Sequence, residues 1–255
     1  MTTNIDGRRI IITGAATGIG LAALRTFAAA GAQLVAIFRS SPPPADVARS
    51  ATWMQCDLTD RDAVLATFGA AAAELGGLDV LLHCAGVWAP ATPADLAPAD
   101  LAHSMAANLD STVFTNQAAY AHMRSTGGAI INIGSSEGVA GSPISVHYAM
   151  AKGAVHTWTR SAARAWGPDR VTVNAVAPCV DTTNANRLRE HLGRGGEDGD
   201  ALLAARMKAI IPLGGAFGDA ERDLAPVLAF LSSDSARFIT GQLIAVDGGL
   251  RMLGA

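Results

Sequence analysis

Cysteine is scarce in this chain, which has 3 cysteines among its 255 residues. Cys56, Cys84 and Cys179 are odd in number and lie far apart, and none stands in a Cys-x-x-Cys pair or in a Cys/His spacing typical of zinc ligands. We therefore expect neither a disulfide framework nor a zinc site. The 6 histidines show no ligand spacing with carboxylate support either, so we predict no metal.

Charged residues are also few, at 16% of the chain, and the net charge of -3 with a pI near 6.0 gives no electrostatic reason to expect nucleic acid or anionic lipid. Long apolar runs are missing, because Gly, Pro or polar residues interrupt each stretch well before the ~20 residues that span a bilayer. The first residues lack the basic stretch, apolar run and cleavage site of a signal peptide. We predict a soluble cytoplasmic protein with no nucleic-acid or membrane partner.

Apolar sequence, in contrast, is abundant at 50% of the residues, which is enough for a sizeable buried core. Short apolar runs rich in β-branched residues recur along the chain, and their continuous rather than alternating pattern is typical of strands buried on both faces. The predicted strands are Arg9–Thr13, Gln33–Phe38, Thr52–Cys56, Val80–Cys84, Ala129–Ile133, Val171–Val176 and Leu243–Val246.

Stretches with a helical pattern separate these runs. They are Ile19–Ala30, Arg61–Leu75, Leu101–Met123, Ser145–Trp166 and Asp219–Ser232. Strand alternating with helix predicts right-handed crossovers and a parallel sheet with helices on both sides. No internal repeat or long linker divides the chain. The predicted fold class is α/β, a doubly wound parallel sheet (Rossmann fold) forming a single domain over residues 1–255.

One polar and charged stretch, Asp181–Ile211, breaks the pattern and has a Gly-rich centre at Gly193–Gly199. It follows the carboxyl end of a predicted strand, where ligands bind in doubly wound sheets. We therefore predict a mobile lid over a substrate at 181–211. A solvated surface excursion is the alternative.

A glycine-rich turn, TGAATGIG from Thr13 to Gly20, joins the first predicted strand to the first predicted helix. Glycines at such a turn let the backbone approach a pyrophosphate, which the positive N-terminus of the helix attracts. Because the turn stands between a strand and a helix, we predict that it binds a dinucleotide.

Tyr148 and Lys152 lie four residues apart at the start of a predicted helix, which puts both side chains on one helix face. A neighbouring ammonium is expected to lower the pKa of the phenol from its usual ~10 and so to make Tyr148 a usable proton donor and acceptor. Ser135 follows the end of the strand Ala129–Ile133, where its hydroxyl can bond a substrate oxygen. Ser136 is the neighbouring candidate.

Together these motifs resemble the short-chain dehydrogenase/reductase family. The turn matches the family's TGxxxGxG, and Ser135 precedes Tyr148 by the usual thirteen residues. Asn108 resembles the helix asparagine that holds a water linking Lys152 to solvent. The resemblance covers nearly the whole chain and implies an NAD(P)-dependent alcohol dehydrogenase or ketone reductase whose catalytic residues are Ser135, Tyr148, Lys152 and Asn108.

The same resemblance implies a nicotinamide cofactor and the residues that bind it. Asp57 resembles the acceptor of the adenine amine, although a place in a helix N-cap region is nearly as good an interpretation. The segment Val173–Cys179 resembles the strand and turn whose backbone receives the nicotinamide carboxamide. The implied cofactor-binding residues are Gly14, Thr17, Gly18, Ile19, Gly20, Phe38, Arg39, Asp57, Leu58, Cys84, Ala85, Gly86, Tyr148, Lys152, Pro178, Val180 and Thr183.

The choice between NADP and NAD depends on the end of the second predicted strand. Phe38 occupies the place where an NAD-selective family member carries Asp, and residues 21–45 contain no acid. Arg39 follows, and a guanidinium can grip a 2′-phosphate in bidentate fashion. Thr17, however, stands where many NADP-dependent relatives carry a second basic residue, and Arg39 can also stack on adenine. We predict NADP and leave NAD as the alternative.

Two departures from the family pattern stand near the expected site. Cys84-Ala85-Gly86 replaces Asn-Ala-Gly, which predicts the loss of a side-chain hydrogen bond in the central sheet. Cys179 replaces the glycine after Pro178 and is interpreted as a small packing residue rather than a reactive thiol.

The substrate and the assembly are predicted more coarsely. Trp88, Val139, Ile144 and Val180 indicate a mostly apolar pocket, hence a hydrophobic secondary alcohol or ketone. The last predicted strand, within Gly241–Gly249, resembles a family segment often found in subunit interfaces, so we expect a homotetramer or homodimer. The alternative function is a non-catalytic nucleotide-binding regulator on the same fold, which is expected to lack part of the catalytic set.

Overall fold

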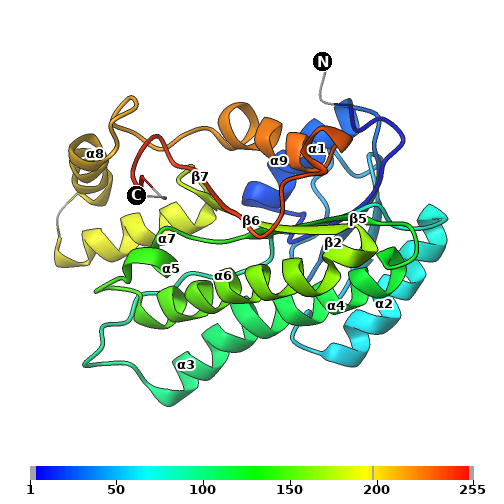
Figure 1. Cartoon of the computed structure of the whole chain (residues 1–255). Coiled ribbons are helices and arrows are strands. Elements are labelled where there is room, and N and C mark those ends of the chain that lie inside the picture. Colours follow the sequence, from blue (N-terminus) through cyan, green and yellow to red (C-terminus); the bar gives the residue numbers. More distant parts are fainter. Residues whose placement is uncertain (1–3, 197, 253–255) are drawn as a thin grey trace.

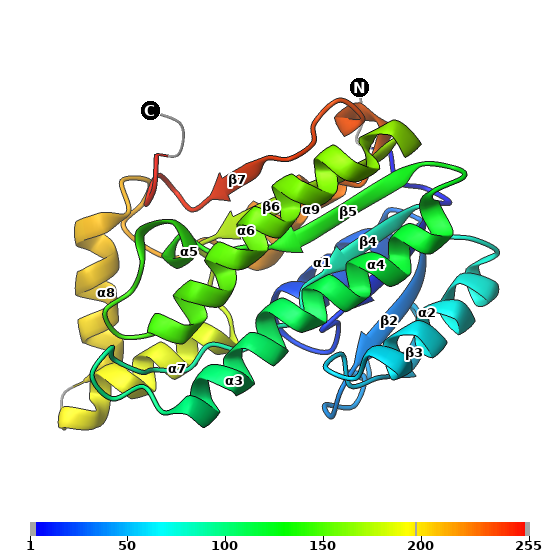
Figure 2. The ribbon, with the colours of Figure 1, turned by 60° about the horizontal axis from the view of Figure 1, so that its bottom comes forward.

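The computed structural model describes residues 4–196 and 198–252, and a seven-stranded parallel sheet forms its centre (Figures 1 and 2). The strands stand in the order β3-β2-β1-β4-β5-β6-β7, and each neighbouring pair is parallel. Their bounds are β1 Arg9–Thr13, β2 Gln33–Phe38, β3 Thr52–Gln55, β4 Val80–His83, β5 Gly128–Ile133, β6 Val171–Pro178 and β7 Leu243–Val246.

Helices cover both faces of the sheet, α1 and α9 on one side and α2, α4 and α6 on the other (Figure 1). The α-helices are α1 Gly18–Ala29, α2 Arg61–Leu75, α3 Pro98–Met105, α4 Ser111–Met123, α5 Glu137–Ala140, α6 Val146–Trp166, α7 Thr183–Leu192, α8 Gly199–Ile210 and α9 Ala225–Leu231. Shorter turns are η1 Ala106–Asp110, η2 Gly167–Asp169, η3 Gly193–Gly195, η4 Ala220–Leu224 and η5 Asp234–Ala236.

The continuous apolar strands explain this layering. In β1, Ile10 and Ile12 belong to the core beneath α1 and α9, whereas Ile11 belongs to the core beneath α2, α4 and α6. All three are 0% exposed. Because successive side chains of a strand point to opposite faces, a strand can be apolar at every position only if both faces are covered. The predicted doubly wound Rossmann fold is confirmed.

The strand boundaries agree with the sequence prediction within two residues at most, but several helical regions differ, among them the predicted helix Asp219–Ser232, which begins with the π-helical turn η4. The predicted helix Leu101–Met123 begins earlier, at Pro98, and a π-helical turn, η1, interrupts it. Asp181–Ile211 is largely helical, forming α7 and α8 with the turn η3 between them. Neither helix of the described part of this segment was predicted, although Leu203, Met207 and Ile211 stand at helical spacing and form a small buried cluster.

The order of the strands places a crevice between β1 and β4. From β1 the chain proceeds outward to β2, whereas β4 lies on the other side of β1, so the loops after β1 and β4 diverge at their carboxyl ends. Such a switch point is where doubly wound sheets bind ligands. Among the described residues, no helix is both long and apolar enough to cross a membrane.

Candidate active site

The glycine turn after β1 leaves no space for a side chain at Gly14 or Gly20. A Cβ at Gly20 would lie 2.3 Å from the Gly14 oxygen, and one at Gly14 would lie 2.9 Å from the nitrogen of Ala85. Gly14 has a φ of +63° and Gly18 one of +54°, which are left-handed values that favour glycine. The turn therefore brings bare backbone to the crevice between β1 and β4.

The N-terminus of α1 is suited to an anion. Its cap residue, Thr17, makes no side-chain hydrogen bond to the helix, and the first turn contains no acidic residue. The first N–H groups of a helix have no partner within it, and the helix dipole favours negative charge there. A pyrophosphate can therefore accept hydrogen bonds at this end of α1 without displacing a capping side chain.

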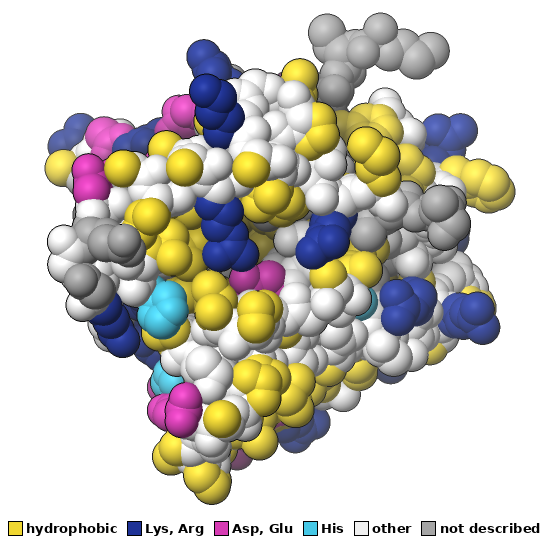
Figure 3. All heavy atoms as spheres, turned by 90° about the vertical axis from the view of Figure 1, so that its left-hand side faces the viewer, with side chains coloured by type: hydrophobic (Ala, Val, Ile, Leu, Met, Phe, Trp, Pro, Cys, Tyr) yellow, Lys and Arg dark blue, Asp and Glu magenta, His cyan; other side chains and the backbone are white. Residues whose placement is uncertain are grey.

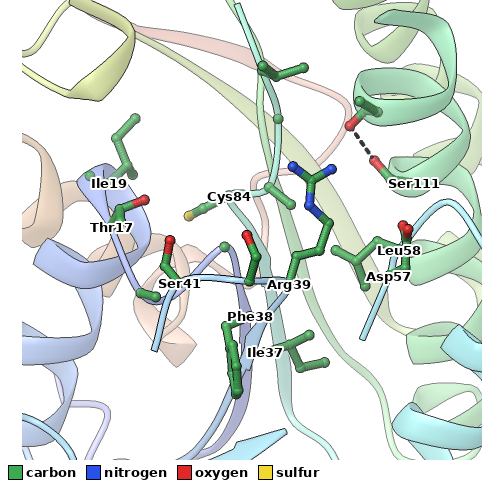
Figure 4. A pocket seen from close by; sticks show the side chains of 18 of the residues that line it. Thr17, Ile19, Ile37, Phe38, Arg39, Ser41, Asp57, Leu58, Cys84 and Ser111 are labelled. Atoms are coloured by element: carbon green, nitrogen blue, oxygen red, sulfur yellow. Dashed lines mark hydrogen bonds between the residues drawn. The ribbon is translucent and has the colours of Figure 1, made fainter. Parts of the chain in front are cut away.

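A cavity of about 370 Å³ opens in front of this turn, and we call it the glycine-turn cavity (Figure 4). Most predicted cofactor residues line it. They are Gly14, Thr17, Gly18, Ile19, Phe38, Arg39, Asp57, Leu58, Cys84, Ala85 and Gly86. Gly20 lies behind the turn and is buried. The residues Ser40, Ser41 and Thr59 also line the cavity and were not predicted.

Arg39 is exposed, and its side chain extends from the end of β2 into the cavity (Figure 4). Its side chain has no ion pair or hydrogen bond with any described residue, whereas its carbonyl accepts a bond of 2.7 Å from Gln55 Nε2. Phe38 contacts Trp53 edge to face, with ring centroids 6.2 Å apart. The guanidinium of Arg39 is thus free to meet a ligand at the end of β2.

Asp57 is held in a turn before α2. Its Oδ1 accepts bonds from the Thr59 backbone N–H at 3.0 Å and the Thr59 hydroxyl at 2.8 Å. These bonds lower the pKa of Asp57, and the charge of Arg39 adds to the effect. The cap of α2 is Asp60, whose carboxylate accepts from Asp62 and Ala63 N–H groups. Asp60 is therefore the helix cap, and Asp57 lies three residues before it.

A second cavity, of about 300 Å³, contains the predicted catalytic group, and we call it the Tyr148 cavity. Ser135 reaches it from the loop after β5, and Tyr148 and Lys152 reach it from α6. Pro178 and Val180 line it from the end of β6. The sheet and one helix thus bring together residues that lie 13 and 17 positions apart in the chain.

Ser135 is held by one hydrogen bond at its side chain and one at its backbone. Its Oγ accepts the Glu137 backbone N–H at 3.1 Å, so its own proton remains free to donate. Its backbone N–H donates to Nε2 of the buried His156 at 3.3 Å. Burial lowers the pKa of His156 to about 4, and the Lys152 charge works in the same direction. His156 is therefore a neutral acceptor, which the sequence did not reveal.

The pKa of Tyr148 differs from the prediction. Burial raises it, the negative charge of Glu137 raises it further, and the Ser135 hydroxyl works in the other direction. The Lys152 Nζ lies 5.7 Å from the centre of the Tyr148 ring and donates a bond of 2.7 Å to the Ile133 carbonyl. The expected lowering of the Tyr148 pKa is therefore wrong, because desolvation is the largest effect on this phenol.

Lys152 is 2% exposed, and burial lowers its pKa to about 8. Asn108 lies in the π-helical turn η1 and is fully buried. Its Oδ1 accepts the Val87 N–H at 3.0 Å, and its Nδ2 donates to the Val87 carbonyl at 3.0 Å. The Asn108 side chain thus clamps the loop after β4, and the π-helical turn gives it that position.

A buried histidine stands at the end of β4. His83 Nδ1 lies within hydrogen-bonding distance, 3.0 Å, of the hydroxyls of both Thr13 and Thr115. Its Nε2 has no partner among the described residues. Burial lowers the pKa of His83 to about 3, and Lys152 adds to the effect. His83 links β1, β4 and α4 as a neutral ring.

The departure at Cys84 agrees with the interpretation from the sequence. Its thiol makes no hydrogen bond with a described residue, and burial raises its pKa. Cys179 lines the Tyr148 cavity, and burial raises its pKa to about 12, so its thiol stays protonated and unreactive at neutral pH.

The predicted lid segment lies against both cavities. Asn184 of α7 accepts the Trp88 N–H at 3.4 Å, and Arg187 donates to the Trp88 carbonyl at 3.1 Å. Arg206 and Met207 of α8 line the Tyr148 cavity. The side chain of Thr183, a predicted cofactor residue, lies outside the described part of the structure.

The expected apolar pocket is only partly apolar. Trp88 and Val180 line the Tyr148 cavity, but Val139 and Ile144 are not among the described residues that line it, and Val139 is 49% exposed. Charged side chains line it as well, from Glu137, Arg206 and Arg251. The face of the molecule that carries α7 and α8 shows a hollow edged by apolar side chains with charged side chains of both signs within it (Figure 3).

The chain matches the family model described as enoyl-(acyl carrier protein) reductase over residues 14–251. It is 38% identical to the cis-4-hydroxycyclohexanecarboxylate dehydrogenase of Sinomonas cyclohexanicum over 252 residues, which are 95% of this chain and 96% of the relative. The chain belongs to the short-chain dehydrogenase/reductase family.

Other members of the family show the same extent of match. The meso-2,3-butanediol dehydrogenase of Serratia marcescens is 35% identical, with 96% of this chain and 94% of the relative covered. A crystal structure assigned as a short-chain alcohol dehydrogenase of Sinorhizobium meliloti superposes with a TM-score of 0.87 at 32% identity and covers 98% of both chains. This short-chain dehydrogenase/reductase is therefore a nicotinamide-dependent oxidoreductase, and the comparisons give no support to the non-catalytic alternative.

The residues present fit the nicotinamide cofactor that the family implies. Gly14 and Gly20 leave no room for a Cβ, the N-terminus of α1 carries no acid, and the glycine-turn cavity adjoins the Tyr148 cavity. Ile19, Cys84 and Gly86 line both cavities. A dinucleotide lying in the first cavity can therefore reach the second.

Proposed function

We propose that this short-chain dehydrogenase/reductase interconverts a secondary alcohol and its ketone in the Tyr148 cavity, with Ser135, Tyr148 and Lys152 as its catalytic residues. One observation carries the proposal: the three side chains line a single cavity that adjoins the glycine turn. A bound nicotinamide supplies the carbon that gives or takes the hydride. The remaining chemistry, which is binding and proton transfer, belongs to the chain.

In the reduction of a ketone, Tyr148 donates the proton that the oxygen needs as the hydride reaches the carbon. The raised pKa of Tyr148 keeps the phenol protonated at neutral pH, which is the donating form. Ser135 donates a second hydrogen bond to the same oxygen, since the Glu137 N–H already occupies an acceptor site on its Oγ. The negative charge that develops on the oxygen is thereby shared.

In the oxidation of an alcohol, the Tyr148 phenolate accepts the hydroxyl proton. The buried ammonium of Lys152 lies near the ring and favours the phenolate at that moment. We propose that Asn108 supports the return of this proton to solvent through a water beside Lys152. A Cβ at Gly86 would lie 2.8 Å from Asn108 Oδ1 and 3.5 Å from Lys152 Nζ, so both groups stand beside the same glycine.

The chain offers a matched control for the proton donor, because its only other tyrosine is Tyr120. We expect Tyr148→Phe to lower kcat by about 100-fold or more, with unchanged binding of the cofactor. Tyr120→Phe removes a hydroxyl that bonds Asp169, outside both cavities, and kcat should stay near the wild-type value. A Tyr148→Phe enzyme with full turnover refutes the proposed mechanism.

For the cofactor we propose NADP, with the Arg39 guanidinium on the 2′-phosphate. The support is the free, exposed Arg39 side chain in the glycine-turn cavity and the absence of an acid from residues 21–45. Arg39→Asp should weaken NADPH binding by at least tenfold in a fluorescence titration, whereas NADH binding should hold or improve. Arg49→Asp, the same charge change away from the cavity, is the control. Equal losses for both cofactors would leave NAD as the better choice.

Further proposals concern the segment 181–211, the assembly of the protein, its location and its substrates. We propose that residues 181–211 act as a lid, because α7 and α8 line the Tyr148 cavity and Asn184 and Arg187 hold Trp88. A homotetramer or homodimer, supported by the match of β7 to the family, is checked by light scattering. A cytoplasmic location stays a prediction. Because the relatives act on cis-4-hydroxycyclohexanecarboxylate and meso-2,3-butanediol, cyclic alcohols and diols are the first substrates to test.

A further inference from the structure

A partly buried carboxylate lies beside the catalytic group without a role in the proton transfer. Glu137 begins α5, two residues after Ser135, and lines the Tyr148 cavity. It lies close enough to Tyr148 for its charge to act on the phenol. A carboxylate in this position destabilises the phenolate, so the mechanism alone gives no reason for its presence.

The carboxylate is held firmly on one side only. Its Oε2 accepts the Ser145 hydroxyl at 2.6 Å and the Trp88 indole N–H at 3.3 Å. The Ser145 Oγ is in turn 2.7 Å from the Ser142 Oγ, which fixes the direction of its own bond. Glu137 Oε1 makes no hydrogen bond with any described residue. A carboxylate offers acceptor sites on both oxygens, so Oε1 is available to the contents of the cavity.

The charges around Glu137 limit which hydrogen-bond donors of a ligand can lie against its carboxylate. Arg206 lies near enough to oppose the burial effect on its pKa, and Arg251 lines the same cavity. Two guanidinium groups repel an ammonium, and the carboxylate itself repels an acid placed directly against it. The donor that fits best is an uncharged hydroxyl.

We infer that Glu137 Oε1 accepts a hydrogen bond from a second hydroxyl of the substrate, close to the reacting carbon, and so selects diols and hydroxyketones over simple alcohols. Trp88 and Ser145 act as positioning residues that orient the carboxylate. This inference rests on the proposed function, since it names the substrate class of that same site. It replaces the hydrophobic substrate expected from the sequence.

The energy of such a bond is sufficient for selection. A hydrogen bond to a charged group contributes more than one between neutral groups, and its loss inside a cavity leaves Oε1 desolvated without a partner. A site built to bind a hydroxyl rejects the analogue that lacks it more strongly than an apolar pocket rejects an extra one. We expect kcat/KM for a suitable diol to exceed that for the matching mono-alcohol by about 10- to 100-fold.

The experiment compares cyclohexanol with cyclohexane-1,2-, 1,3- and 1,4-diol in the wild-type enzyme and in Glu137→Gln and Glu137→Leu, with the preferred nicotinamide at saturation. Gln keeps the shape and can still accept from Ser145 and Trp88, so its amide NH₂ faces the cavity. Leu removes the acceptor altogether. The ratio of kcat/KM for the best diol to kcat/KM for cyclohexanol should fall about tenfold with Gln and more with Leu.

The kinetic comparison and a binding measurement together distinguish this inference from its alternatives. Equal losses for diol and cyclohexanol in both variants, or no diol above cyclohexanol in the wild type, would show that Glu137 only supports the loop and would overturn the inference. If no turnover is detected, calorimetry measures the affinity of the protein for the diols, for cyclohexanol and for 2-hydroxycyclohexanone. If the protein binds diols more tightly than cyclohexanol, depends on Glu137 for this difference and oxidises neither, the hydroxyl subsite is retained and the proposed function is refuted. If it binds both equally, the subsite is refuted.

Discussion

Two buried imidazoles should make the protein sensitive to mild acid. His83 and His156 are 1% and 4% exposed, and burial lowers their pKa values from 6.5 to about 3 and about 4. In an unfolded chain both histidines titrate near ~6.5. The unfolded state therefore binds protons first as the pH falls, and stability that is fully present above pH ~6.5 is lost progressively below it.

The magnitude follows from the width of this window. At pH 5 both rings are still neutral in the folded chain but charged in the unfolded one. At about 1.36 kcal/mol per pKa unit, each ring loses about 2 kcal/mol of unfolding free energy between pH 6.5 and pH 5, and the two together lose about 4 kcal/mol. Such a loss is a large part of the stability of an ordinary domain.

Urea unfolding at pH 7, 6 and 5, at one protein concentration, measures this loss. His83→Asn places an amide group, which can donate or accept, where Nδ1 bonds the threonine hydroxyls. His156→Gln places an amide oxygen where Nε2 accepts the Ser135 N–H. Each variant should remove about 2 kcal/mol of the loss at pH 5. Glu137, whose raised pKa acts in the opposite direction, and the buried His147, whose lowered pKa acts in the same direction, are present in all three proteins and cancel. Variants that lose as much stability as the wild type would show that these rings do not cause the loss.

Three other outcomes can be checked directly. Gly20→Ala should abolish tight cofactor binding in a fluorescence titration, because its Cβ would lie 2.3 Å from the Gly14 oxygen; unchanged affinity would mean that the turn is not the phosphate site. In ketone reduction, kcat/KM should fall above about pH 8 as Lys152 loses its proton, and Lys152→Arg should move this limb upward; a limb that stays at the same pH belongs to another group. Asp79→Asn should cost about 1–3 kcal/mol of unfolding free energy, because it breaks the paired bonds from Arg9 at 2.6 and 3.0 Å, and a loss below 0.5 kcal/mol would contradict this.

The sheet could be predicted from the sequence because its signal is local. Buried parallel strands are apolar at every position, and the turns between them are marked by glycine and polar residues. The π-helical turn at Asn108 could not be predicted, since it has no composition of its own and depends on the bonds of that side chain to Val87. The helices within 181–211 were missed because the polar composition and the glycines at 193–199 suggested a loop, although Leu203, Met207 and Ile211 form a short apolar stripe on α8 and its end.

The candidate site shows the same division. Tyr148, Lys152 and Ser135 could be found from spacing, because the strand end and the helix face fix where they point. Glu137 and His156 could not, because a glutamate at the start of a short helix is typical of a capping position, and a histidine inside a helix has no sequence mark of its partner. The sign of the Tyr148 pKa was wrong for a similar reason: burial is a property of the whole fold, not of the YxxxK spacing.

The wall between the two cavities is made of side chains that face both. Ile19 and Cys84, together with Thr182 and Asn184 at the start of α7, border each of them. Enlarging one compartment therefore reshapes the other, and cofactor choice and substrate choice cannot be engineered as separate traits. A variant selected for a bulkier alcohol has to be assayed again with both nicotinamides, since its preference between them is open to change without any substitution at Arg39.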